Sequence, residues 1–121
     1  MLGLTPETKV FIQPGVTDGR YGLEALRGLI VKTVQQSPTS GHLFCFANRA
    51  RTRMKLVWHR EGVFYLTTCV IEGTFDFPRD AAAARTISWE QLEAILRGAR
   101  FTRTRDFDGD AARASNGGYR R

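Results

Sequence analysis

The segment GHLFCFANRARTRMKLVWHREGVFYLTTCVI, residues 41–71, decides the fold of this chain. Its first part, GHLFCFA (41–47), is a continuous apolar run typical of a buried strand. RMKLVWH (53–59) alternates, with Met54, Leu56 and Trp58 on one face and Arg53, Lys55 and Val57 on the other. GVFYLTTCVI (62–71) is aromatic and β-branched, and the REG before it signals a tight turn. The segment therefore predicts a three-stranded antiparallel meander.

The residues before the meander predict one short strand and one helix. KVFIQ (Lys9–Gln13) reads as the strand, and the turn-rich PGVTDG (14–19) follows it. Apolar residues then recur at helical spacing between Arg20 and Gln36, which predicts a helix over that range. Thr17 or Asp18 is the expected N-cap, and Ser37-Pro38 ends the helix because the residue before proline avoids helical dihedrals.

A second helix is predicted after the meander. GTFDFP (Gly73–Pro78) indicates a turn and a short extended piece at a sheet edge, because proline cannot donate to a strand ladder. Ser88 and Gln91 then have the spacing of a capping box, and Gly98 stands where a helix would close. We expect this helix over Ser88–Arg97.

These elements predict an α+β fold with a small antiparallel sheet of four to six strands and two helices packed on it. We expect one folded domain, residues 1–98, followed by an Arg-rich flexible tail, residues 99–121, that is poor in aliphatic side chains. The chain length of 121 residues agrees with a single domain.

The chain is basic, with a formal charge of +6 and a pI of about 10.0. Such a charge is typical of proteins that meet nucleic acid, an anionic membrane surface or an acidic protein. The sequence has no bilayer-spanning apolar stretch and no signal-peptide pattern, so we expect a cytoplasmic protein. Cys45 and Cys69 lie in apolar surroundings and are expected to be reduced core residues.

No pattern in the sequence indicates catalysis. His42 and His59 have no metal-ligand spacing with the two cysteines, and no nucleophile or phosphate-loop motif is present. DFDGD (106–110) resembles the start of a calcium loop, but position twelve would be Gly117 instead of glutamate. We therefore expect no enzyme activity, no metal, no cofactor and no small-molecule substrate.

The most unusual local feature is the basic stretch NRARTRMK (48–55). Arg49, Arg51, Arg53 and Lys55 occupy every second position, which would place them on one side of an extended chain, and Arg60 follows closely. A solvated hairpin and an acidic protein partner remain open as explanations. DNA phosphates are favoured, because they reward such a cluster through counterion release.

The order of these motifs resembles one family, the TnpB-type accessory protein (second open reading frame) of the IS-sixty-six group of bacterial insertion sequences. The resemblance covers roughly residues 4–98, and its most specific part is SGHLFCF, the basic turn, RMKLVW and the following strand. His59 and Arg60 replace the family's usual acidic turn, which shifts positive charge toward Arg60 and the tail. The positions that match the family pattern are Asp18, Arg20, Ser40, Gly41, Leu43, Phe44, Phe46, Arg49, Arg53, Lys55, Trp58, Gly73, Phe75, Pro78, Gln91, Leu92 and Leu96.

The resemblance implies a bacterial, non-catalytic accessory protein of DNA transposition, encoded beside a separate transposase that performs strand transfer. Its expected partners are DNA at the insertion-sequence ends and that transposase. The alternative is a protein-interaction module that docks on the transposase without contacting DNA. The candidate DNA-binding residues are Arg20, Arg49, Arg51, Arg53, Lys55 and Arg60.

Overall fold

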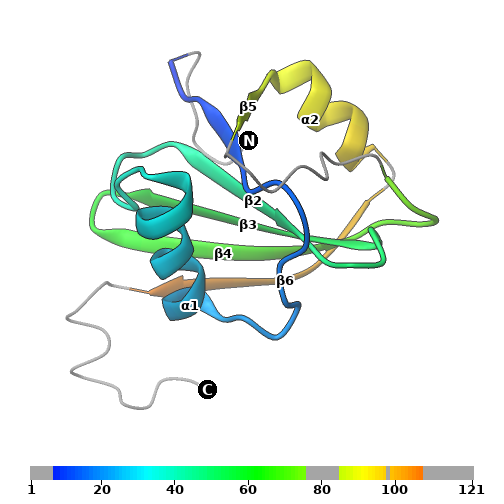
Figure 1. The fold of residues 1–121 in the computed structure, drawn as a ribbon, viewed down its shortest axis with the longest axis horizontal. Coiled ribbons are helices and arrows are strands. Elements are labelled where there is room, and N and C mark those ends of the chain that lie inside the picture. The colour runs from blue at the N-terminus through cyan, green and yellow to red at the C-terminus, as the bar shows by residue number, and fades with distance from the viewer. Residues whose placement is uncertain (1–6, 76–84, 98, 108–121) are drawn as a thin grey trace.

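The computed structural model describes residues 7–75, 85–97 and 99–107. They form a six-stranded sheet in the order β5-β1-β2-β3-β4-β6, with helical segments on it, and this architecture confirms the predicted α+β class (Figure 1). The elements are β1 (Val10–Ile12), α1 (Leu23–Leu29), the π-helix η1 (Ile30–Val34), β2 (Leu43–Ala47), β3 (Arg53–Arg60), β4 (Val63–Val70), β5 (Arg85–Ile87), α2 (Trp89–Leu96) and β6 (Arg100–Phe107).

The central meander has the predicted form. β2 pairs antiparallel with β3, and β3 pairs antiparallel with β4 in a continuous register from Arg53↔Val70 to Arg60↔Val63. Glu61 and Gly62 connect the last two strands with φ angles of 52° and 83°. Positive φ at both central residues is the signature of a two-residue turn whose twist matches that of the strands.

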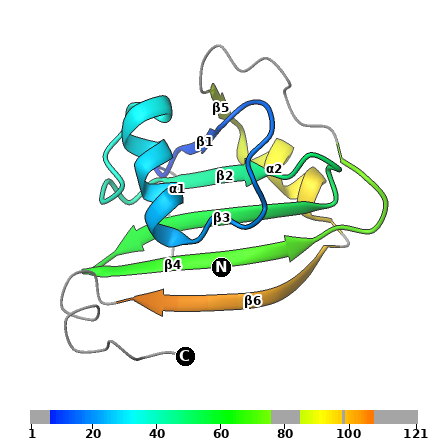
Figure 2. The same cartoon turned by 60° about the horizontal axis from the view of Figure 1, so that its bottom comes forward.

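Each face of the sheet carries one helix, and the alternation along β3 divides the core between them. Met54, Leu56 and Trp58 are buried in a cluster that includes Leu92 of α2. Val57 is buried in a second cluster with the apolar residues of α1. In Figure 2, α1 lies in front of the strands and α2 behind them. The predicted assignment of these β3 side chains to two faces is therefore confirmed.

The first helix is shorter at its start than the predicted range of residues 20–36. It begins at Leu23 after the N-cap Gly22, whose lack of a side chain means that no side-chain cap exists, and η1 extends it to Val34. Thr17 and Asp18 are not its caps, because residues 17–22 run as a loop across the sheet. The predicted inward-facing residues Leu23, Leu26, Ile30 and Val34 are all buried.

The second helix has the predicted capping box. The backbone N–H of Gln91 donates to Ser88 Oγ over 3.0 Å, and the backbone N–H of Ser88 donates to Gln91 Oε1 over 2.7 Å. Leu92 is fully buried beneath the sheet. The expected closing residue, Gly98, lies outside the described residues.

Both ends of the sheet differ from the prediction. β1 pairs parallel with β2 and antiparallel with β5, so the sheet is not wholly antiparallel. Residues 100–107, expected in a flexible tail, form β6 and pair with β4, so strand pairing continues past the expected domain boundary at residue 98. The rest of that tail, residues 108–121, lies outside the described residues, as do residues 76–78 of the expected edge piece.

Candidate functional site

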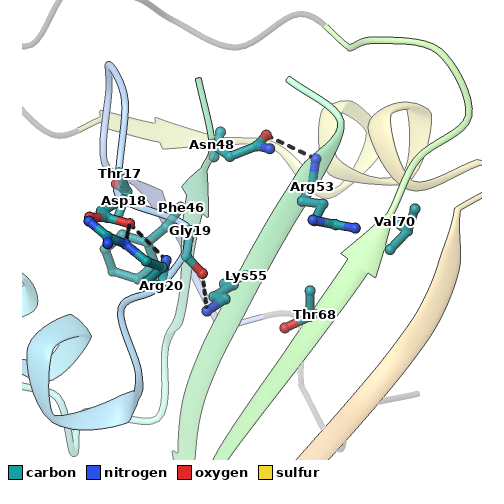
Figure 3. Close-up of a pocket in the computed structure, with 11 residues that line it drawn as sticks. Thr17, Asp18, Gly19, Arg20, Phe46, Asn48, Arg53, Lys55, Thr68 and Val70 are labelled. Atoms are coloured by element: carbon teal, nitrogen blue, oxygen red, sulfur yellow. Dashed lines mark hydrogen bonds and ion pairs between the residues drawn. The ribbon is translucent and has the colours of Figure 1, made fainter. Parts of the chain in front are cut away.

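The candidate site is a groove on the α1 face of the sheet. α1 covers Val57, Phe64 and Leu66, but the same face continues past the N-terminus of the helix. There it opens into a groove of about 680 Å³ (Figure 3). We call this feature the basic groove; its lining residues are Thr17, Asp18, Gly19, Arg20, Phe46, Ala47, Asn48, Arg53, Lys55, Thr68 and Val70.

Lys55, on the floor of the basic groove, bonds to the loop before α1, which forms the wall of the groove. Its Nζ donates to the carbonyl oxygen of Gly19 over 2.8 Å and to that of Tyr21 over 2.7 Å. The loop before α1 is thereby tied to the middle of β3. Because hydrogen bonds from a charged donor are stronger than neutral ones, Lys55 shapes the groove as well as giving it positive charge.

Arg20 and Asp18 form an ion pair on that loop. Arg20 Nη2 lies 2.9 Å from Asp18 Oδ2, Nε lies 3.1 Å from Oδ1, and the Arg20 backbone N–H also donates to Oδ1 over 2.9 Å. The Arg20 side chain is 90% exposed. The side-chain hydrogen bond from Arg20, followed by the backbone one, lowers the pKa of Asp18 to about 2. Asp18 therefore stays ionised at neutral pH and offsets the charge of Arg20.

Arg53 presents its side chain to solvent at the groove. Its backbone N–H donates to Asn48 Oδ1 over 3.0 Å, and Asn48 Oδ1 also accepts from the Thr52 backbone N–H over 3.0 Å. These bonds fix the turn between β2 and β3. The guanidinium of Arg53 makes no hydrogen bond or ion pair with any residue in the described ranges, so it is available to a ligand.

Arg51 is not on the same surface, and its predicted place in a row of four cations is wrong. Residues 49–52 form a turn instead of an extended strand, and Arg51 adopts a φ of 60°. Its side chain is 4% exposed, and its Nη1 donates to the carbonyl oxygen of Asn48 over 3.3 Å. Its own carbonyl accepts the Phe75 N–H over 3.2 Å. Arg51 is therefore part of the turn's structure, while Arg49 beside it is exposed.

Arg60 lies at the other end of β3. With a rise of about 3.3 Å per residue, it is about 23 Å from Arg53 along the strand. Its surroundings differ too: the Arg27 guanidinium lies 4.4 Å from the centre of the Phe64 ring, which is 4.6 Å from the ring of His59. Burial, with a smaller contribution from Arg27, lowers the pKa of His59. Of the six predicted residues, the structure brings Arg20, Arg53 and Lys55 together at the groove.

Sequence reasoning missed the polar residues that complete the groove. Thr17 is 6% exposed, and its hydroxyl has no hydrogen-bond partner within the described part of the chain. Thr68 of β4 pairs with Lys55 of β3, which places it on the groove floor. The alternation of side chains along β3 and β4 could have predicted that Thr68 shares a face with Lys55. Nothing local to Thr17 predicts that its loop crosses the sheet.

The histidine, cysteine and acidic side chains of the described residues are the groups that a metal site or a reactive thiol would need. In residues 7–75, 85–97 and 99–107, no cluster of three or more His, Cys, Asp or Glu side chains could hold a metal ion. Cys45 and Cys69 are buried free thiols, and burial raises the pKa of both, that of Cys69 to about 12. Within the same ranges, no helix has the length and apolar character needed to cross a bilayer.

The comparisons with known proteins match this chain to one family and to an uncharacterized relative. The family described as IS66 Orf2-like protein (TnpB_IS66) matches residues 8–106, which includes most of β6. The uncharacterized protein y4hO of Sinorhizobium fredii (strain NBRC 101917 / NGR234) is 30% identical over 99 residues, which cover 81% of this chain and 86% of that protein. No solved structure matches the chain.

Proposed function

This chain belongs to the IS66 Orf2-like family, whose membership implies an accessory role in transposition, and we propose that it performs this role by binding DNA phosphates at the basic groove. The protein would hold DNA near the ends of the insertion sequence and help to assemble the transposase complex. Strand-transfer chemistry would remain with the separate transposase.

The observation that carries this proposal is the composition of the basic groove. Arg20, Arg53 and Lys55 line it with a single carboxylate, Asp18. Positive side chains at a groove release condensed counterions when they meet phosphates, which gives affinity without reading sequence. Arg53 supports the proposal most directly, because its exposed guanidinium is not engaged by other described side chains.

The two other exposed cations from the candidate set have unequal roles in this proposal. Arg49 extends the positive surface from the turn next to the groove. Arg60 would join it only when a duplex follows the whole length of β3, because it lies at the far end of that strand. Substituting Arg60 therefore tests whether DNA runs along the strand.

The proposal is tested by fluorescence anisotropy of the full chain with a labelled duplex from the element's end and a scrambled duplex, over about 50–200 mM salt. We expect affinity to fall steeply with salt. Arg53→Gln should reduce the slope of log K against log salt by about 1. Lys32→Gln is the matched control, because Lys32 is an exposed cation about 15 Å along the helix axis from Gly22, at the groove end. Absence of binding at the lowest salt would refute the proposal.

One observation favours docking on the transposase without contact to DNA. Asp18 already offsets Arg20, and Lys55 is bonded to two carbonyl groups, so part of the groove's charge is committed within the protein. A pull-down of transposase that resists nuclease, together with no DNA shift by the isolated protein, would support this alternative.

A further inference from the structure

Taking the proposed function as its basis, we infer that the DNA backbone crosses the sheet at right angles to the strands, from the basic groove to β6. Arg100 and Arg103 of β6 are then phosphate-binding residues. This path replaces one along the hairpin, and it uses arginines outside the candidate set.

The register of the sheet aligns basic positions across three strands. Arg53 of β3 pairs with Val70 of β4, and Val70 pairs with Arg100 of β6. One step along the same face of β3 and β4, Lys55 pairs with Thr68, and Thr68 pairs with Arg103. A register shift between Thr68 and Cys69 inserts one extra residue in β6, so positions 100 and 103 can both pair on this face. Figure 2 shows β3, β4 and β6 side by side in this order. Each cross-strand row therefore starts at a cation on β3 and ends at a basic position on β6.

The paired residues of both rows lie on the side of the sheet that carries the basic groove. Residues directly opposite each other in an antiparallel pair share a face. Val70 and Thr68 both line the basic groove, so the rows that they belong to lie on the groove side. Arg100 is exposed. Neither row contains a carboxylate.

The dimensions of the rows fit a nucleic-acid backbone. Neighbouring strands lie about 4.8 Å apart, so β3 and β6 are separated by about 10 Å. A DNA strand that runs in this direction can therefore bring neighbouring phosphates to the two ends of a row.

A phosphate backbone fits this surface better than an acidic protein does. Stable protein interfaces are anchored by aromatic side chains and arginines that pack into buried pockets, usually together with apolar neighbours. The large exposed apolar residues in the described ranges are Val16, Tyr21 and Val31, and none of them lines the groove or belongs to either row. Charge is thus the feature that the surface offers along the whole path, and the ligand class is a phosphodiester chain.

The test compares the full-length double variant Arg100→Gln/Arg103→Gln with Lys32→Gln, which removes one distant exposed charge. Salt-dependent anisotropy with the same labelled duplex is the readout. Losing two phosphate contacts should reduce the log–log slope by about 2 and weaken binding at 0.1 M salt about sixtyfold, since each contact contributes about eightfold there. Lys32→Gln should leave the slope unchanged. Arg100→Lys/Arg103→Lys should restore most of it.

The possible failures can be told apart. If the wild-type protein does not bind DNA, the proposed function and the path both fall. When Arg53→Gln weakens binding but the β6 double variant does not, the path is overturned and the proposed function stands. Equal losses in the glutamine and lysine double variants, with lowered thermal stability in both, would show a strand-pairing effect instead of a charge effect and would also overturn the path.

Discussion

Lys55→Met should lower the stability of the protein, although the change affects one surface lysine. Methionine keeps the aliphatic stem of lysine and removes its ammonium group. The carbonyl groups of Gly19 and Tyr21 then lose their donor, and the wall of the basic groove loses its attachment to β3. The matched control is Arg53→Met, which removes one positive charge from the same face of the same strand.

The expected size of the effect comes from the two hydrogen bonds. A hydrogen bond to a charged group contributes about 1.5–3 kcal/mol when it is well buried. Both bonds here lie at an exposed site, where water can replace the ammonium group, so we expect about 1–2 kcal/mol in total and a fall in Tm of about 3–8 °C. Arg53→Met should stay within about 0.5 kcal/mol of the wild type, as surface substitutions usually do.

Urea unfolding followed by circular dichroism, with scanning calorimetry for Tm, measures both variants. Equal stability of Lys55→Met and Arg53→Met would refute the reasoning that Lys55 ties the loop to the sheet. In DNA titrations both variants should show a smaller slope of log K against log salt, because each removes a cation from the groove. Lys55→Met alone should combine that loss with lower stability.

Three further outcomes follow from the same structure. The Asp18 carboxyl should titrate near pH 2 by NMR; because its folded pKa is depressed, the stability that it contributes is present above about pH 4 and is lost toward pH 2, with no change between pH 5 and 8. Asp18→Asn should tighten DNA binding, and weaker binding would contradict the proposed role of the groove. Arg51→Ala should cost about 1–3 kcal/mol in urea unfolding while Arg49→Ala costs less than about 0.5, and equal costs would place Arg51 at the surface. Cys45 and Cys69 should resist a thiol reagent in the native protein and both react after denaturation; fast native labelling would contradict their burial.

The elements set by local pattern could be predicted from the sequence. The alternation of Met54, Leu56 and Trp58 with charged residues determined the two faces of β3, because side chains on a strand project with a period of two. The Ser88 and Gln91 spacing predicted the capping box, since its hydrogen bonds are local. Both features depend on residues that are neighbours along the chain.

The elements set by distant contacts could not be predicted in the same way. β1 and β2 pair in parallel because the chain between them, which contains α1, crosses back so that β2 starts at the same end of the sheet as β1. β6 contains few aliphatic residues, and its strand conformation depends on the free edge of β4. Arg51 was misplaced because alternation was extended through a turn, where a positive φ directs the side chain inward. Four of the eleven residues that line the basic groove belong to the loop from Thr17 to Arg20, and local patterns did not predict the position of this loop.

The position of β6 at the end of the sheet also bears on self-association. A long edge strand exposes backbone groups that can pair with another chain, and proteins commonly protect such edges with charge. β6 is eight residues long, and its sequence RFTRTRDF carries three arginines and one aspartate. Two free copies of the protein would therefore repel each other at this edge. Bound DNA would neutralise that charge, so the same arginines would keep copies apart in solution and allow them to crowd together on a duplex.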